Sequence, residues 1–177
     1  MCRYNAGIVS EKERSNMAYE SYKTVEESRT EWLKCIQYED INGNDRLFGG
    51  RLMSWMDEVA GIAATRHCGG YVTTAAVDNL QFKAGCFLND IIVVRAKLTY
   101  VGRTSMEVRV DVYIEERDSG QRRVINRAYF TEVQVDEKGR PVPLKYGLTP
   151  ETEVEKAEWE GAKKRLEVRR QRRVEGF

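Results

Sequence analysis

The most constraining feature of this chain is a helical pattern that is apolar in several directions and precedes a series of strand-like segments. Between about residues 50 and 66, Leu52, Met56, Val59 and Ala63 recur at helical spacing and define one apolar face. Further apolar residues lie in other directions, which predicts a helix that is buried on most sides. At about 1.5 Å per residue this helix spans roughly 25 Å, which is enough to cross a small sheet.

Strand-like segments surround this helix in the sequence. They are Thr24–Tyr38 before it, with imperfect alternation, and Tyr71–Phe82, Asp90–Val101, Ser105–Glu116 and Arg123–Val135 after it. The turns between the later segments are short, which favours antiparallel pairing, and no long crossover indicates a parallel pair. The compact solution is an α+β fold in which one curved antiparallel sheet of about five to six strands wraps the long helix.

The remaining segments predict three parts of the chain. Residues 1–20 are polar without a clear period and are expected to be a flexible extension, while residues 21–145 hold the folded domain. Residues 146–177 are expected to form a C-terminal helix from about Pro150 to Arg172, with Thr149 as N-cap and Pro150 in the first helical position. The basic stretch Lys163–Arg173 is interpreted as a solvated helix end, because no interleaved aromatic residues favour base stacking.

Composition excludes several classes of function. The 177 residues carry 29 Lys plus Arg against 28 Asp plus Glu, so no net field attracts nucleic acid or an anionic membrane. No signal peptide or long apolar run is evident, so we expect a cytoplasmic protein without a membrane partner. The four cysteines lack metal-ligand spacing and His67 is the only histidine, which disfavours a zinc site. Cys35 and Cys86 are expected to be buried free thiols.

Candidate chemistry is concentrated between residues 40 and 82. A polar loop at 40–45 leads through Gly49-Gly50 into the helix, and glycines at a helix start leave backbone N–H groups open to an incoming oxygen. The helix carries Asp57 where an apolar residue is expected. A carboxylate in apolar surroundings is costly unless it is hydrogen-bonded or has a function.

Several spaced motifs in this region resemble the hotdog-fold acyl-CoA thioesterases, specifically the acyl-CoA hydrolase group. The matching motifs are Asn42…Phe48-Gly49-Gly50…Met56-Asp57-Glu58-Val59-Ala60-Gly61, Thr65-Arg66-His67-Cys68, Val77-Asp78-Asn79-Leu80-Gln81-Phe82 and Gly102-Arg103-Thr104-Ser105-Met106-Glu107. The resemblance covers about residues 23–144. It departs at Asp45, where family members often have glycine, and at Phe48, where some relatives carry histidine.

The resemblance implies a sheet wrapped around a central helix, dimers of hotdog units, and a homohexamer built as a trimer of dimers. It also implies an active site shared between units, with an asparagine of one facing an aspartate of its neighbour. The substrate would be a coenzyme A thioester, and no other cofactor is expected.

Four residues are candidates for roles in thioester hydrolysis. Asp57 is the candidate general base or nucleophile, because apolar surroundings are expected to raise its pKa. Asn42 can orient water or the thioester oxygen, and the backbone N–H of Gly50 or Gly49 can face the oxyanion. Structural alternatives remain open for each: a hydrogen-bonded helix aspartate, an ordinary loop asparagine and a tight strand-to-helix junction.

The substrate-binding candidates follow from the resemblance as well. Arg103-Thr104-Ser105 matches the segment near the nucleotide, and Lys83 can contribute charge to phosphate binding. The acyl chain is expected to run past Met53, Met56 and Phe82, and Asp78 is a second, more often structural, carboxylate. The alternative function is a non-catalytic acyl-CoA-binding module. A hotdog dehydratase is disfavoured, because His67 is far along the helix from the glycine pair.

Overall fold

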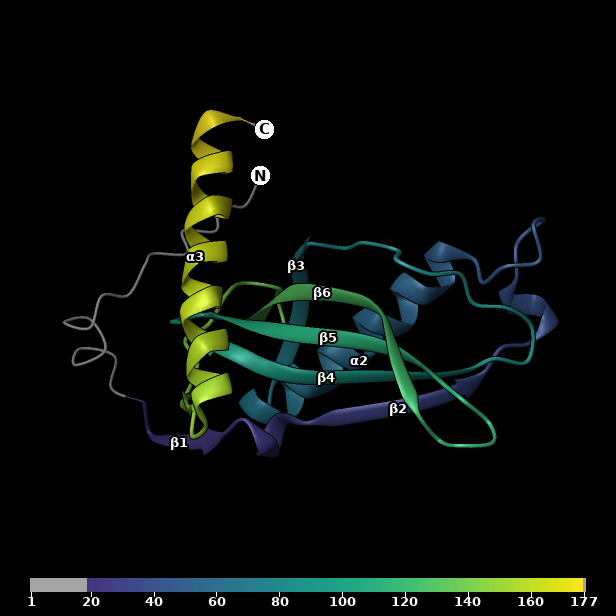
Figure 1. Cartoon of the computed structure of the whole chain (residues 1–177). Coiled ribbons are helices and arrows are strands. Elements are labelled where there is room, and N and C mark those ends of the chain that lie inside the picture. Colours follow the sequence, from purple (N-terminus) through teal and green to yellow (C-terminus); the bar gives the residue numbers. More distant parts are fainter. Residues whose placement is uncertain (1–18, 177) are drawn as a thin grey trace.

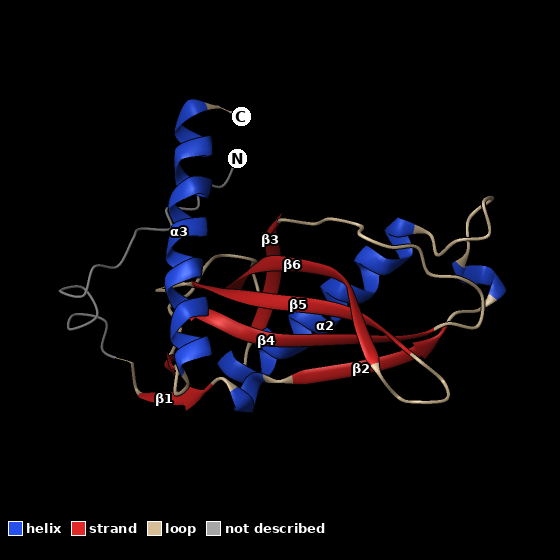
Figure 2. Cartoon of the chain, in the orientation of Figure 1, coloured by secondary structure: helices blue, strands red, loops and turns tan. Residues whose placement is uncertain are grey.

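The structure is a computed structural model and describes residues 19–176. A five-stranded sheet with the order β2-β4-β5-β6-β3 wraps the long helix α2, and every pair in it is antiparallel (Figures 1 and 2). The elements of this domain are β2 (Thr30–Cys35), α2 (Gly49–Cys68), β3 (Tyr71–Asp78), β4 (Ile91–Val101), β5 (Ser105–Glu115) and β6 (Arg122–Val135), with short 3₁₀ helices η1 (Glu26–Ser28) and η2 (Tyr38–Asp40). The predicted α+β architecture is confirmed.

Helix α2 forms the centre of the core, but it is not buried on most sides as predicted. Leu52, Met56 and Val59 are buried against the sheet. Met53 and Ile62, on another side of the helix, are 40% and 41% exposed in this single chain. An apolar helix face left open in this way is a surface that a second chain could cover.

The ends of α2 follow from glycine. Gly69 adopts φ +69°, a left-handed conformation that costs a glycine little, and its N–H closes the helix on the carbonyl of Thr65. At the other end the N-cap residue, Phe48, makes no side-chain capping hydrogen bond. The backbone N–H groups of the first turn therefore have no side-chain cap.

A second, two-stranded sheet corrects the expectation that all pairs are antiparallel. β1 (Ser21–Thr24) pairs in parallel with β7 (Tyr146–Thr149), and this pair joins segments from opposite ends of the domain. Both strands have four residues, which is too short for a periodic signal. The segment predicted as one strand from Thr24 to Tyr38 is divided by η1, so its main strand is only β2.

The β1–β7 sheet also encloses His67 at the end of α2. His67 is 1% exposed and its Nε2 lies 3.1 Å from the carbonyl oxygen of Tyr146. Burial lowers the pKa of this imidazole below its ordinary value, although the hydrogen bond to Tyr146 opposes the shift. His67 is therefore buried at the end of α2, in surroundings that disfavour its charged form.

The C-terminal helix α3 (Glu153–Glu175) begins later than predicted. Thr152, not Thr149, is the N-cap, because its side chain accepts from the N–H of Glu155 while the Glu155 carboxylate accepts from the N–H of Thr152. Helix α3 lies across the face of the sheet opposite α2 (Figure 1). Trp159 packs on Tyr100 with ring centroids 4.6 Å apart.

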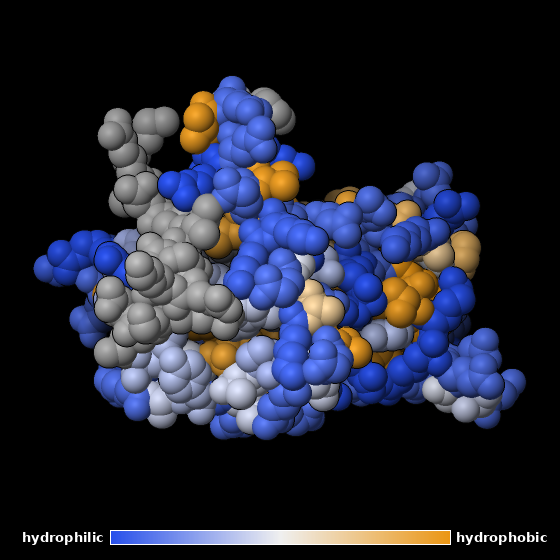
Figure 3. All heavy atoms as spheres, turned by 60° about the vertical axis from the view of Figure 1, so that its left-hand side comes forward, coloured by the Kyte–Doolittle hydropathy of each residue, from blue (hydrophilic) through white to orange (hydrophobic). Residues whose placement is uncertain are grey.

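Surface properties complete the description of the domain. Hydrophilic residues cover most of the face shown in Figure 3, and hydrophobic residues there form separate patches. Of the two predicted buried thiols, Cys86 is buried, whereas Cys35 at the end of edge strand β2 is exposed. Within residues 19–176, no helix has the length and apolar content needed to cross a membrane.

Candidate functional site

The predicted catalytic residues fall into two groups within one chain. Asn42, Gly49 and Gly50 lie around the start of α2, and we call this region the Asn42 pocket. Asp57 lies eight residues after Gly49, which is about 12 Å further along the helix axis. There it meets Thr74 of β3, and with Glu132 of β6 these two residues form the Asp57 cluster.

The loop that carries Asn42 is held by short-range hydrogen bonds. The Asn42 side-chain oxygen accepts from the backbone N–H of Asn44 at 2.9 Å and of Arg46 at 3.4 Å. The backbone N–H of Asn42 donates to the carbonyl of Arg46 at 2.7 Å. Asp45 adopts φ +55°, a left-handed conformation that suits glycine but that aspartate tolerates.

Asp40 joins this loop to its surroundings. Its carboxylate is 3% exposed and lies 3.1 Å from the ammonium of Lys34 and 3.6 Å from the guanidinium of Arg51 on α2. Its carbonyl accepts the N–H of Phe48 at 2.8 Å, just before α2 begins. The start of the helix and the Asn42 loop are thereby fixed to β2.

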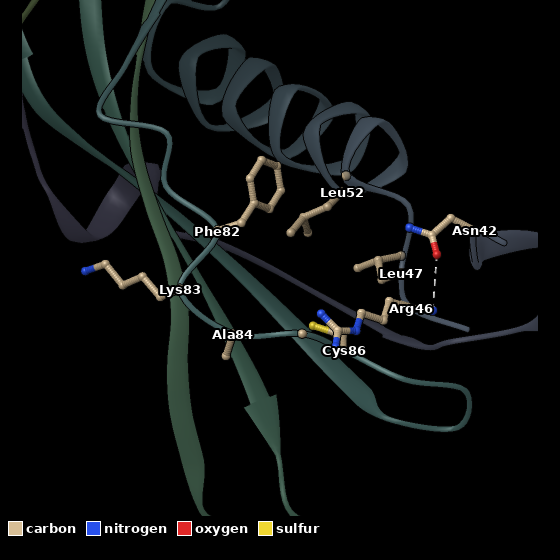
Figure 4. Close-up of a pocket in the computed structure, with 10 residues that line it drawn as sticks. Asn42, Arg46, Leu47, Leu52, Phe82, Lys83, Ala84 and Cys86 are labelled. Carbon is tan, nitrogen blue, oxygen red and sulfur yellow. Dashed lines mark hydrogen bonds between the residues drawn. The ribbon is translucent and has the colours of Figure 1, made fainter. Parts of the chain in front are cut away.

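The Asn42 pocket itself has a volume of about 350 Å³ and is lined by Asn42, Arg46, Leu47, Gly49, Leu52, Phe82, Lys83, Ala84, Gly85 and Cys86. The ring of Phe82 points toward the start of α2, whereas the Lys83 side chain extends away from Asn42 (Figure 4). The side-chain oxygen of Asn42 already accepts hydrogen bonds from its own loop. The side-chain NH₂ is therefore the part of Asn42 that remains to bind a ligand, and it does so as a donor.

The glycine pair is needed for two different close approaches. A Cβ on Gly49 would lie 3.2 Å from Cζ of Phe82, so glycine lets this ring reach the helix start. A Cβ on Gly50 would lie 2.7 Å from the ring of Phe48. Both substitutions would displace an aromatic ring, and the ring of Phe82 lines the pocket.

Cys86 lines the same pocket but is not a nucleophile. Burial, with the nearby charge of Asp90 adding to it, raises the pKa of its thiol to about 12. The sulfur therefore stays protonated near neutral pH, and only the thiolate attacks a thioester efficiently.

The Asp57 cluster places one hydroxyl between two carboxyl groups. The Oγ1 of Thr74 lies 2.6 Å from Oδ1 of Asp57 and 3.1 Å from Oε1 of Glu132. The prediction that Asp57 lies in apolar surroundings is wrong for the single chain, since Asp57 is exposed. It is a hydrogen-bonded carboxylate on the open side of α2.

Glu132 is the buried member of this cluster. It is 1% exposed, and its Oε2 has no hydrogen-bond partner within the described residues. Its pKa is raised from 4.5 to about 7: burial is the largest cause, the charge of Asp57 adds to it, and the hydrogen bond with Thr74 opposes both. The neutral acid is therefore strongly favoured in this position compared with an exposed glutamate.

The two groups lie toward opposite ends of the sheet. Thr74 pairs with Glu132 and Glu132 with Met106, next to the Arg103–Ser105 turn that joins β4 to β5. The Asn42 pocket borders the other end of β4, whose 11 residues span roughly 35 Å. One chain therefore does not bring Asn42 to Asp57, and Arg103 is exposed on the Asp57 side.

The other predicted binding residues differ in availability. Phe82 and Lys83 line the Asn42 pocket, and Met53 is exposed on the open side of α2. Met56 is fully buried in the core, which removes it from any open channel in this chain. Asp78 forms an ion pair with Arg169 of α3, so a ligand could use its carboxylate only by displacing that arginine.

Sequence reasoning missed Thr74 and Glu132. Each follows a threonine in its strand, Thr73 and Thr131, and a threonine in a strand is ordinary. The available signal was Glu132 within the apolar run of β6, where a charged residue faces the core side of the sheet. Its partner across the β3–β6 pair could not be assigned without the register.

Comparisons with known proteins bear on this arrangement. The profile described as the thioesterase superfamily matches residues 44–121. The uncharacterized acyl-CoA thioester hydrolase YkhA of Bacillus subtilis is 39% identical over 116 residues, covering 66% of this chain and 67% of that protein. The cytosolic acyl coenzyme A thioester hydrolase of Homo sapiens is 36% identical over 80% of this chain, which spans 38% of the human protein.

Solved structures agree with the fold. An acyl-CoA hydrolase of Staphylococcus aureus in complex with butyryl coenzyme A has a TM-score of 0.82 and 34% identity, covering 88% of this chain and 94% of that one. Structures of that hydrolase also exist for variants in which one asparagine, one aspartate or one threonine is replaced by alanine. An apo-hexameric acyl-CoA thioesterase has a TM-score of 0.80 and 36% identity, covering 86% and 96%.

A hotdog sheet around a central helix, with a polar site along that helix, defines a thioesterase-like protein. The chain belongs to the thioesterase superfamily, in its acyl-CoA hydrolase group. By homology it is an enzyme, an acyl-CoA thioester hydrolase.

Proposed function

We propose that this chain hydrolyses the thioester of fatty acyl-CoA to free coenzyme A and a carboxylic acid, with Asp57 as general base or nucleophile. The observation that carries the proposal is the Thr74 hydroxyl, which lies 2.6 Å from Oδ1 of an Asp57 that is otherwise exposed. A carboxylate held by one oxygen keeps the other free to accept a proton from water or to attack a carbonyl.

The intervals between three residues support the same assignment. In the Staphylococcus aureus hydrolase, the asparagine, aspartate and threonine chosen for replacement are separated by 15 and 17 residues. Asn42, Asp57 and Thr74 are separated by the same two intervals. We therefore propose that Thr74 positions Asp57 and that Asn42 belongs to the same reaction.

The distance between the two groups supports a site built by two chains. Gly49, which lines the same pocket as Asn42, lies about 12 Å along α2 from Asp57, so we propose that Asn42 and the glycine pair face Asp57 of a partner chain. The Asn42 amide would then orient water or the thioester oxygen, and the N–H of Gly50 or Gly49 would stabilise the oxyanion. The exposed side of α2 near Met53 and Ile62 would be covered in such a dimer.

Larger features of the proposal follow from this dimer. Lys83 lies on the Asn42 side and the Arg103–Ser105 turn on the Asp57 side, so both would border a shared site and could receive coenzyme A phosphates. The acyl chain would pass Phe82 and Met53. We further propose a homohexamer, a trimer of hotdog dimers, in the cytoplasm.

The test measures free thiol released from a panel of acyl-CoA substrates of increasing chain length. We expect turnover by the wild-type chain and a loss of about 10²–10⁴-fold in kcat for Asp57→Asn. Glu58→Gln is the matched control, because it removes the neighbouring exposed carboxylate of the same helix and leaves Thr74 untouched. Acyl-CoA binding without thiol release by the wild type would instead identify a binding module.

A further inference from the structure

The hydroxyl of Thr74 has a single proton for two carboxyl neighbours. The shorter contact, 2.6 Å to Asp57, identifies the Asp57 oxygen as its acceptor. A contact of 3.1 Å then remains between Oγ1 of Thr74 and Oε1 of Glu132. Two oxygens at this distance form a hydrogen bond only if one of them carries a proton, so the proton of this second bond must come from Glu132.

The surroundings of Glu132 agree with a protonated side chain. On the core side of the sheet its pairing neighbours are Thr74 of β3 and Met106 of β5, neither of which has a charge. The charged group that faces it is Asp57 from α2, and that charge is negative. An ionised Glu132 would be 1% exposed beside another anion with no cation to compensate it among its described neighbours.

From this geometry we propose that Glu132 is a positioning residue that donates its carboxylic acid proton to Thr74 Oγ1, which directs the Thr74 proton to Asp57. The inference rests on the proposed role of Asp57 in hydrolysis. Glu132 touches no substrate and acts through Thr74. Its effect is to keep one Asp57 oxygen hydrogen-bonded while the other faces the reacting water.

We call this pair of hydrogen bonds, from Glu132 to Thr74 and from Thr74 to Asp57, the Glu132 relay, and it changes when Glu132 loses its proton. Thr74 then has two anionic acceptors and only one proton, so its hydroxyl turns to Glu132 for part of the time. Asp57 loses its fixed orientation and gains a second negative charge nearby. Since burial and the Asp57 charge bring the pKa of Glu132 to about 7, this loss falls within the working range of a cytoplasmic enzyme.

A pH profile tests the relay through activity. We expect wild-type kcat to fall by about tenfold as Glu132 ionises and then to level off, with KM changing by less than about twofold. Glu132→Gln replaces the acid by an amide donor that does not titrate, so its kcat should stay within about threefold over the same range. Glu158→Gln, which removes a carboxylate paired with Arg109 on the far side of the sheet, should keep the wild-type profile.

A second measurement reads the relay without any substrate. In protein with ¹³C at the glutamate carboxyl carbons, we expect one signal to titrate near pH 7, to be missing in Glu132→Gln, and to shift to lower pH in Asp57→Asn. Absence of such a signal, or a wild-type pH profile in Glu132→Gln, overturns the proposal. If the enzyme proves inactive on every thioester, this titration still decides whether the relay exists.

Discussion

The Asn42 pocket and the Asp57 cluster are built in opposite ways. Asn42 is held by hydrogen bonds to amides two and four residues away, in a loop tied to the sheet through Asp40. Asp57 is held by Thr74, 17 residues later, and Thr74 by Glu132, 58 residues later still. One group depends on a local turn and the other on the pairing of strands. Substitutions in the two groups should therefore have different effects on activity and stability.

The two groups also differ in exposure. Among the described residues, those that line the Asn42 pocket include no acid, while the Asp57 cluster has one exposed and one buried carboxyl group. A site assembled from both would combine a side held by a local turn with a side held by strand pairing. Experiments that treat the two groups separately can test whether they act as one site.

The largest effect is expected from mixing two inactive variants. Asn42→Ala and Asp57→Asn each lack one group, but random exchange at equal concentration makes about one site in four complete, because half of the dimers are mixed and each mixed dimer has one complete site of two. Mixed protein should therefore recover about a quarter of wild-type thiol release, from a level lower by about 10²-fold or more. Exchange verified by native mass spectrometry without any recovery would mean that each chain holds a complete site.

A smaller effect, on stability, is expected from Glu132 as pH rises. The folded chain holds a proton with a pKa of about 7 where the unfolded chain releases it near 4.5, so this contribution is complete below 4.5 and is lost as pH passes 7. The shift corresponds to about 3 kcal/mol of unfolding free energy.

Urea unfolding of wild type and Glu132→Gln at several pH values measures this difference. The buried His67 titrates in the opposite sense, since its lowered pKa removes stability as pH falls, and it is present in both proteins. The difference between the two proteins therefore isolates Glu132. A difference that stays constant from pH 5 to 8 would show that the side chain is ionised throughout.

Substitutions of two glycines in α2 should distinguish an effect on the Asn42 pocket from an effect on the helix. Gly49→Val places new atoms against the ring of Phe82, so we expect kcat/KM to fall by about tenfold while the cluster around Asp57 remains intact. Gly61→Ala is the control, because nothing lies within 4 Å of its added carbon and alanine favours a helix by about 0.5–1 kcal/mol. Equal activity of the two variants would show that the position of the Phe82 ring does not affect substrate binding.

The smallest effect distinguishes two roles of Asn42. Asn42→Asp keeps an oxygen for the amides of Asn44 and Arg46, whereas Asn42→Ala removes it, so only the alanine variant should lose about 1 kcal/mol of stability. Both variants lack the side-chain NH₂ and should lose activity. If aspartate retained full turnover, the amide would have only its structural role in the loop.

Much of the fold could be predicted from sequence because its elements are long and periodic. Strand β5, with apolar residues alternating from Met106 to Ile114, was placed almost to its ends, and α2 within two residues at each end. The four-residue strands β1 and β7 carry too few residues for a period, and their parallel pairing joins residues more than 120 positions apart. Such a contact depends on tertiary packing rather than local pattern.

The candidate site was predictable where the signal was local. Asn42, the glycine pair and Asp57 were found through a short motif, although the burial assigned to Asp57 was wrong because apolar residues on α2 can also await a partner chain. Thr74 and Glu132 required the register of β3 against β6, which includes an irregularity between Thr74 and Ala76. A bulge shifts every later pair, so sequence alone gives no fixed partner there.

The pairing of β1 with β7 has a consequence for how the chain is made. During synthesis the first strand leaves the ribosome more than a hundred residues before its only described neighbour in that sheet, so it waits unpaired until Tyr146–Thr149 emerges. The imidazole at the end of α2 waits with it, since its acceptor is the Tyr146 carbonyl. The two-stranded sheet is thus completed only when β7 has been synthesised, and a ribosome stalled before β7 would hold a domain in which β1 lacks its partner strand.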